Sequence, residues 1–193
     1  MRQLVIATQN THKLDEYRQM LEPLKTEVYS LADFDIDDIE ETGDTFEANA
    51  RQKARALKKH TDMLVIADDS GLEVDALGGL PGVRSRRYSD KATDDANNEK
   101  LLKAMENETD RAARFVAVIC LIDEHGEEHV FEGELNGYIH TACTGNGGFG
   151  YDPLFIPVGH TETLAELGPT IKNKLSHRAR ALRKVLDFLK HHE

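Results

Sequence analysis

The chain has 193 residues, of which 39% are hydrophobic and 31% charged, and its formal net charge at pH 7 is −11. This composition predicts a soluble globular protein with one compact domain or two small lobes, and it excludes a disordered or fibrous chain. The acidic excess argues against general binding to nucleic acid or to an anionic membrane, and no apolar run is long enough to span a bilayer.

Two features favour a cytoplasmic protein. The first residues lead directly into the apolar run Leu4–Ala7, without the charged, apolar and small-residue pattern of a signal peptide. The only cysteines, Cys120 and Cys143, form no CxxC motif, and this usage fits a reducing compartment.

Apolar runs and helical stripes alternate along most of the chain. We expect strands at 4–7, 28–31, 63–67, 114–122 and 131–139. We expect helices at 14–24 with Pro23 marking the end, at 46–57 with Asp44 or Thr45 as the cap, at 93–105 with Thr93 as the cap, and at 175–189. An acidic loop at 33–44 and a turn at His125-Gly126 connect these elements.

This order of elements predicts the fold class. Strands and helices alternate early, and a long hairpin follows. We therefore expect an α/β protein, 1–193, with a single domain. Its mixed β-sheet with flanking helices would be bent into two lobes around a central substrate cleft.

The segment Ala67–Leu72 carries adjacent carboxylates, Asp68 and Asp69, directly after a predicted buried strand. At a strand end these carboxylates would repel each other unless a cation lay between them, and a hard divalent ion such as Mg²⁺ is the natural candidate. The alternative is a polar turn in which Asp69 or Ser70 caps the following segment.

The segment Ala7–Lys13 joins a predicted strand to a predicted helix. Such a turn offers backbone N–H groups and a positive helix end to phosphate, with Lys13 adding a charge. It lacks the glycines of a Walker loop, and on its own it is better explained as a helix start capped by Asn10.

Three further segments contain groups that could carry chemistry. In Glu40–Phe46 a glutamate could complete a metal site with Asp69, or it could simply favour the helix that follows. In Gly145–Pro153 the glycines allow close approach to a flat ring that Phe149 or Tyr151 could stack on, although a flexible hairpin loop is the alternative. Lys172–Arg178 offers clustered donors or an ordinary basic helix face.

Taken in order, these segments resemble one family, the non-standard purine nucleoside triphosphate pyrophosphatases, or inosine triphosphatases. The matching stretches are Thr8-Gln9-Asn10 with Lys13, Glu41-Thr42-Gly43 with Thr45-Phe46, Asn49-Ala50 with Lys53-Ala54, Ala67–Leu72, Val74–Leu77, Pro81-Gly82-Val83, Arg87-Tyr88, Phe149–Pro153 and Ser176-His177-Arg178. The chain departs from the family pattern at Ala48, Arg86 and Thr170-Ile171, which bears on rate and substrate detail more than on the reaction.

The resemblance implies a homodimer that hydrolyses the triphosphates of inosine, deoxyinosine and xanthosine to the monophosphate and pyrophosphate with Mg²⁺. It implies that Asp69 is the proton acceptor and a metal ligand. Glu40 is the other ligand, with Glu41 as the alternative. The implied substrate-binding residues are Thr8, Gln9, Asn10, Thr11, His12, Lys13 and Lys172 for the triphosphate, Ser70 beside the metal, and Phe149, Gly150, Tyr151, Asp152, His177 and Arg178 around the base.

Base choice follows from hydrogen-bonding chemistry. Hypoxanthine and xanthine carry a 6-oxo acceptor, whereas adenine carries a 6-amino donor, so a donor such as Arg178 would favour the oxo purines. Guanine shares the 6-oxo group, and its exclusion must involve the 2-position. Two rival functions are a pyrophosphatase for modified pyrimidine nucleotides and a nucleotide-binding module without catalysis.

Overall fold

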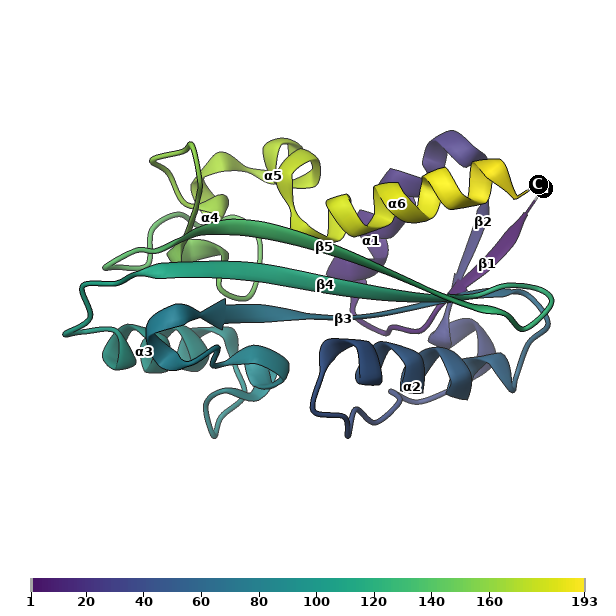
Figure 1. The fold of residues 1–193 in the computed structure, drawn as a ribbon, viewed down its shortest axis with the longest axis horizontal. Coiled ribbons are helices and arrows are strands. Elements are labelled where there is room, and N and C mark those ends of the chain that lie inside the picture. The colour runs from purple at the N-terminus through teal and green to yellow at the C-terminus, as the bar shows by residue number, and fades with distance from the viewer. Residues whose placement is uncertain (1, 193) are drawn as a thin grey trace. The chain divides into compact units, whose positions relative to one another are not determined.

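Six strands form one mixed sheet in the order β2-β1-β3-β4-β5-β6, with helices flanking it (Figure 1). The computed structural model describes residues 2–192. The strands are β1 (Gln3–Ile6), β2 (Glu27–Ser30), β3 (Leu64–Val74), β4 (Ala112–Ile122), β5 (Glu128–Ile139) and β6 (Phe155–Pro157). The helices are α1 (Thr11–Leu21), α2 (Phe46–Lys58), α3 (Asp94–Ala104), α4 (Leu164–Leu167), α5 (Pro169–Leu175) and α6 (His177–His191).

The strand directions confirm the predicted α/β class with a mixed sheet. Strand β1 pairs in parallel with both β2 and β3, and β5 pairs antiparallel with β6. The chain divides into two compact units. The first is Met1–Asp69, Ala117–Gly133 and Ala179–Glu193, and the second is Ser70–Val116 and Glu134–Arg178. The predicted single domain and the predicted cleft remain predictions.

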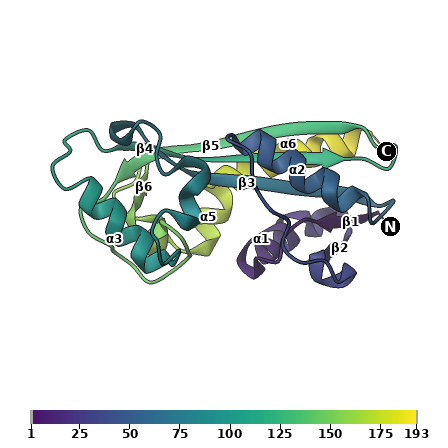
Figure 2. The ribbon, with the colours of Figure 1, turned by 90° about the horizontal axis from the view of Figure 1, so that it is seen from below.

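In the first unit, helices cover both faces of the strands (Figures 1 and 2). Leu4 and Ile6 of β1 lie in one core cluster with Tyr17 of α1 and Leu182 of α6. On the opposite side α2 buries a stripe that includes Leu57. This division follows from the strand repeat, because successive side chains of β1 point to opposite faces.

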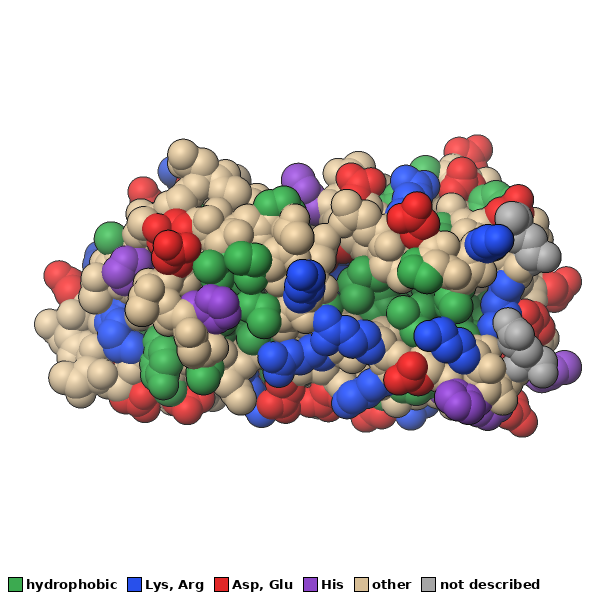
Figure 3. Space-filling model, turned by 90° about the horizontal axis from the view of Figure 1, so that it is seen from above, with side chains coloured by type: hydrophobic (Ala, Val, Ile, Leu, Met, Phe, Trp, Pro, Cys, Tyr) green, Lys and Arg blue, Asp and Glu red, His purple; other side chains and the backbone are tan. Residues whose placement is uncertain are grey.

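The exposed side of α6 is basic although the chain as a whole is acidic. Lys and Arg side chains stand out on the face of the first unit seen in Figure 3. The exposed basic residues of α6 include Arg180, Arg183, Lys184 and Lys190. The charge of the chain is therefore unevenly distributed, and the net value alone does not describe every surface.

The second unit has its own apolar core, against which α3 and the short helices α4 and α5 pack. Its buried residues include Leu72 and Val74 of β3, Leu101 of α3, Phe115 of β4, Leu135 of β5, Phe155 of β6 and Leu164 of α4. The loop residue Tyr151 belongs to the same core. Because Tyr151 lies in the segment Gly145–Pro153, this core anchors that segment, which we call the glycine-rich loop.

Most elements begin or end a few residues away from the expected positions, and two of the differences bear on the site. Strand β3 does not end before the acidic motif but continues through Asp68 and Asp69 to Val74. The last helical stripe is divided between α5, which ends at Leu175, and α6, which begins at His177. Thr45, rather than Asp44, caps α2, because its hydroxyl accepts a hydrogen bond from the Ala48 N–H.

None of the helices in residues 2–192 has the length and apolar character needed to cross a membrane.

Candidate active site

The turn between β1 and α1 is organised by Asn10. Its Oδ1 accepts hydrogen bonds from the backbone N–H groups of His12 (3.0 Å) and Lys13 (3.2 Å), while its own N–H donates to Thr8 Oγ1 (3.0 Å). The predicted helix cap is confirmed. Thr11 and His12 are exposed on the first turn of α1. Because two N–H groups of this turn already have a partner, anion binding here would depend on side chains as well as on the helix end.

Lys13 forms a buried ion pair with Asp68. Lys13 Nζ lies 3.3 Å from Asp68 Oδ1, and the two side chains are 9% and 1% exposed. Burying either charge alone would be costly, so the pair offsets part of the cost of burying each charge. The pair fixes Lys13 against β3 on one side of the strand.

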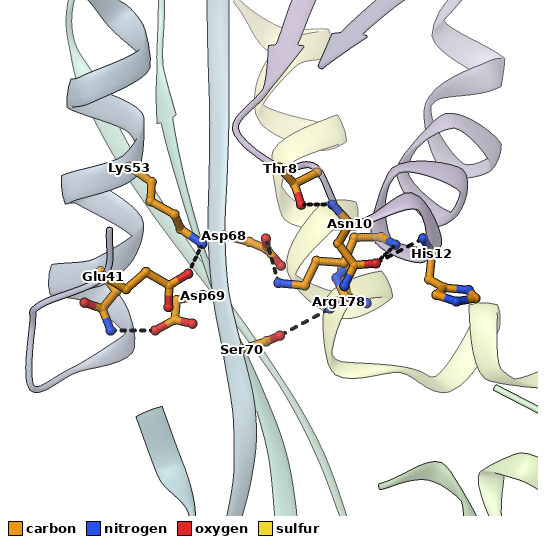
Figure 4. Close-up of polar contacts among 11 residues, drawn as sticks. Thr8, Asn10, His12, Glu41, Lys53, Asp68, Asp69, Ser70 and Arg178 are labelled. Carbon is orange, nitrogen blue, oxygen red and sulfur yellow. Dashed lines mark hydrogen bonds and ion pairs between the residues drawn. The ribbon is translucent and has the colours of Figure 1, made fainter. Parts of the chain in front are cut away.

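Asp69 is surrounded by side chains from α2 and from the loop that precedes it (Figure 4). Asn49 Nδ2 donates to Asp69 Oδ2 at 2.8 Å, and Lys53 Nζ pairs with Glu41 Oε1 at 2.7 Å. Burial, followed by the negative charge of Glu41, raises the pKa of Asp69 from 3.8 to about 6, against the opposing effects of Asn49, Lys53 and Lys13. A carboxylate with this pKa can accept a proton near neutral pH.

Asp68 and Asp69 project to opposite sides of β3, as consecutive residues of a strand must (Figure 4). The expectation that both carboxylates share a cation at a strand end is therefore wrong. The strand runs on, and the aspartates have separate surroundings, with Lys13 paired to Asp68 and Lys53 close enough to lower the pKa of Asp69. A metal would have to bind on the Asp69 side.

The two candidate glutamates differ in their surroundings. Glu40 is exposed, whereas Glu41 is half-buried and raises the pKa of Asp69 by its charge. The acidic loop before them is attached to the β1–α1 turn, because Gln9 Nε2 donates to the Ile36 carbonyl at 2.9 Å. Gln9 thereby has a structural contact in addition to its predicted binding role.

In the second unit, the predicted base-binding residues at the start of α6 are buried and held by neighbours. Arg178 is 2% exposed, and its Nη2 donates to Ser70 Oγ at 3.2 Å (Figure 4). The ring of His177 stacks on Phe115, with centroids 4.8 Å apart and planes inclined by 14°. These contacts restrict the rotamers of both donors.

The glycine-rich loop fixes the carboxylate of Asp152. Its Oδ2 accepts a hydrogen bond from the Phe149 N–H (3.1 Å) and pairs with Lys172 Nζ at 2.7 Å. The same ammonium lies 4.0 Å from the centroid of the Phe149 ring. Gly148 has a φ of +71°, and a Cβ there would lie 2.1 Å from Asp152 Oδ2. These contacts hold the loop in one arrangement, and its role in binding stays a prediction.

The two aromatic residues of this loop have different surroundings. Tyr151 is 4% exposed, and its hydroxyl donates to the Ser85 carbonyl at 2.6 Å. Burial raises the pKa of this phenol. Phe149 is only half-buried. Phe149 is therefore the ring better placed to stack on a ligand, while Tyr151 anchors the loop.

The predicted site residues fall into two sets, one in each unit. The first unit holds Thr8, Gln9, Asn10, Thr11, His12, Lys13, Glu40 and Asp69. The second holds Ser70, Phe149, Gly150, Tyr151, Asp152, Lys172, His177 and Arg178. Asp69 and Ser70, consecutive in β3, join the two sets through the backbone.

The sequence alone assigns no role to Asn49 or Lys53, which lie beside Asp69 and Glu41 in the first unit. The spacing of Asn49 and Lys53 does place both on one face of a helix. The sequence contains no local signal that this face turns toward β3.

In the first unit, a buried carboxylate of raised pKa with lysines nearby is typical of an α/β enzyme that uses acid–base chemistry. The second unit, described by itself, contains hydrogen-bond donors and aromatic rings. The model of the Ham1 family matches residues 4–188, and the chain belongs to this family.

Similar proteins support this assignment. The dITP/XTP pyrophosphatase of Porphyromonas gingivalis is 48% identical over 192 residues, and that of Bacillus subtilis is 46% identical over 194 residues; each comparison covers 98% of both chains. The Ham1 protein of Staphylococcus aureus superposes with a TM-score of 0.90 at 40% identity and covers 100% of both chains. A HAM1 protein from Coxiella burnetii gives 0.91 at 41% identity, covering 99% of this chain and 100% of the other. The family predicted from the sequence is confirmed.

Proposed function

We propose that this protein hydrolyses dITP, ITP and XTP to the nucleoside monophosphate and pyrophosphate, and so removes non-standard purines from the nucleotide pool. Relatives named dITP/XTP pyrophosphatase, similar over nearly the whole chain, support this activity. The observation that carries the proposal is the environment of Asp69, a buried carboxylate with a pKa of about 6 beside Asn49, Glu41 and Lys53.

Asp69 would act as the general base for attack of water on the α-phosphorus. A base whose pKa lies slightly below the working pH is deprotonated yet still basic enough to take a proton in the transition state. Asn49 holds one carboxylate oxygen by a hydrogen bond, so the orientation of the carboxylate is set before substrate arrives. Attack at this phosphorus expels pyrophosphate in a single step.

The residues around Asp69 fit a Mg²⁺ ion. Asp69 and Glu41 are close enough for the charge of one to raise the pKa of the other, and a divalent cation would relieve this repulsion. We favour Glu41 over the exposed Glu40 as the second ligand for this reason. When bound, Mg²⁺ would withdraw negative charge from the phosphate oxygens. The ion pair with Lys53 holds the Glu41 carboxylate near Asp69.

The remaining roles divide between triphosphate and base. Thr8, Asn10 and Lys13 with their neighbours in the β1–α1 turn would contact the triphosphate, as the family resemblance implies. Phe149 would stack on the purine. Arg178 would donate to the 6-oxo group.

Lys172 was expected to bind the triphosphate. Its contacts with Asp152 and the Phe149 ring also suit a second task, which is to orient the loop beside the base. We propose that it serves both the loop and the nearest phosphate. A homodimer in the cytoplasm is part of the same proposal and rests on the family resemblance; light scattering of the purified chain would measure the oligomeric state.

The experiment that tests this function is a panel of triphosphates with Mg²⁺, read for pyrophosphate and orthophosphate separately. The panel contains dITP, XTP, dATP, dGTP and a modified pyrimidine triphosphate. We expect pyrophosphate as the initial product, with the highest kcat/KM for dITP and XTP. Preference for the pyrimidine would favour the first rival function, and binding without turnover would favour a non-catalytic nucleotide-binding module.

A further inference from the structure

Helix α3 holds both backbone groups of Gly150. Asp94 Oδ2 accepts a hydrogen bond from the Gly150 N–H at 2.9 Å, and Asn98 Nδ2 donates to the Gly150 carbonyl at 2.9 Å. The two side chains are four residues apart on α3 and so lie on one face of the helix. Gly150 lies between Phe149 and Asp152, so α3 fixes the middle of the glycine-rich loop.

The surroundings of Asn98 differ from those of its neighbour Asn97, although the two are 4% and 3% exposed. Asn97 uses both ends of its amide, since its Oδ1 accepts from the N–H of Ser89 and its Nδ2 donates to the Arg86 carbonyl. Within residues 2–192, the Oδ1 of Asn98 has no hydrogen-bond partner. An unpaired buried acceptor destabilises the folded state, so stability alone would favour an apolar side chain at this position. The hydrogen bond to Gly150 gives a reason for an amide here.

Gly150 needs this support because its own conformation is not fixed by a side chain. Its φ is +60°, in the left-handed region, and a Cβ built there would meet nothing within 4 Å. Glycine loses more conformational freedom on ordering than any other residue. Without the contacts to α3, the peptide could rotate, and Phe149 would rotate with it.

We propose that Asp94 and Asn98 are positioning residues for base recognition, which hold the Gly150 peptide so that the Phe149 ring and the Asp152 carboxylate face the purine. The inference rests on the proposed function of the loop in binding the base. It predicts a specific defect, in which discrimination among bases is lost while phosphate chemistry at Asp69 is retained.

The most informative variant is Asn98→Leu. Leucine has the same number of side-chain heavy atoms and the same branch point as asparagine, and it removes the unpaired oxygen together with the bond to Gly150. The half-buried Gly150 carbonyl can be solvated, so we expect a Tm close to that of the wild type. The ratio of kcat/KM for dITP over dATP should fall about fivefold or more, the scale of one well-placed hydrogen bond. The loss should come mainly through a higher KM for dITP.

Asp94 offers a paired test with conservative rescue. Asp94→Ala removes the acceptor for the Gly150 N–H and should lower the ratio of kcat/KM for dITP over dATP. It should also increase the rate of amide hydrogen exchange in the segment 149–152. Asp94→Asn keeps an acceptor oxygen and should restore most of the ratio. Thr93→Ala is the matched control, because it removes the N-cap of the same helix without touching Gly150. This control should lower Tm and leave the ratio unchanged.

The outcomes separate this inference from the proposed function. If the wild type releases no pyrophosphate from dITP or XTP, the proposed function is wrong and the inference is wrong with it. If the wild type is active and Asn98→Leu and Asp94→Ala keep the wild-type ratio, the inference alone is overturned. A ratio that falls equally in Thr93→Ala would show a general effect of helix stability and would also overturn it.

Discussion

Replacing Asp69 by asparagine should stop turnover and yet stabilise the metal-free protein above pH 6. The carboxylate is 5% exposed, and its pKa is raised from 3.8 to about 6 by burial and by Glu41. This difference corresponds to about 3 kcal/mol, since each pKa unit is worth ~1.36 kcal/mol. The amide oxygen of the introduced asparagine can still accept the hydrogen bond from Asn49, so the variant mainly loses the negative charge.

The sign of the pH dependence follows from the raised pKa. The folded state binds this proton more tightly than the unfolded state, so the contribution of Asp69 is fully present below pH 3.8 and is lost as pH rises through about 6. Asp69→Asn should therefore match the wild type near pH 4. At pH 7–8 it should exceed it by about 2–3 kcal/mol, or roughly 5–10 °C in Tm for a chain of this size.

The assay is thermal or denaturant unfolding of both proteins between pH 4 and pH 8, with a chelator present so that metal binding does not stabilise the wild type. In a separate assay with Mg²⁺, the turnover of dITP should fall at least about 100-fold.

The neighbouring variant Asp68→Asn is the matched control. It leaves Lys13 buried without its carboxylate, so it should destabilise the protein by about 3 kcal/mol. Equal stability of Asp69→Asn and wild type at every pH would refute the reasoning.

Four other variants test three parts of the site. Glu41→Gln should raise the Mg²⁺ concentration for half-maximal rate about tenfold or more, and Glu40→Gln should change it little; the reverse result would assign the second ligand to Glu40. Arg178→Ala should narrow the kcat/KM ratio of ITP over ATP by at least about tenfold, whereas an equal loss for both nucleotides would place this guanidinium on the phosphates or in the fold. Gly148→Ala should raise the KM for dITP because its methyl group would displace Asp152, and an unchanged KM would argue against a role for that carboxylate in binding.

Much of the fold could be predicted from the sequence because its signals are local. The alternation of apolar runs and helical stripes located β1 to β5 and the helices α1, α2, α3 and α6, but it missed β6 and α4. Thr93 and Asn10 cap the helices that they were expected to cap. The errors arose where tertiary contacts override local pattern. Asp68 and Asp69 look like a strand end, yet lysines from distant segments allow the strand to continue through them.

The candidate site shows the same limit. Sequence reasoning could name a carboxylate, a glycine-rich loop and a basic segment, but it could not choose between Glu40 and Glu41, which are adjacent. The choice depends on which side chain turns toward Lys53. The contacts of Asn98 with Gly150 join residues 52 positions apart, and no periodicity in the chain signals them.

Our central claim is that water attacks the α-phosphorus of a non-standard purine triphosphate. The most direct measurement is hydrolysis of dITP with Mg²⁺ in water enriched in the heavy oxygen isotope, followed by mass spectrometry of both products. We predict that the isotope enters the deoxyinosine monophosphate and is absent from the pyrophosphate. Label in the pyrophosphate, or labelled orthophosphate together with deoxyinosine diphosphate, would contradict the claim.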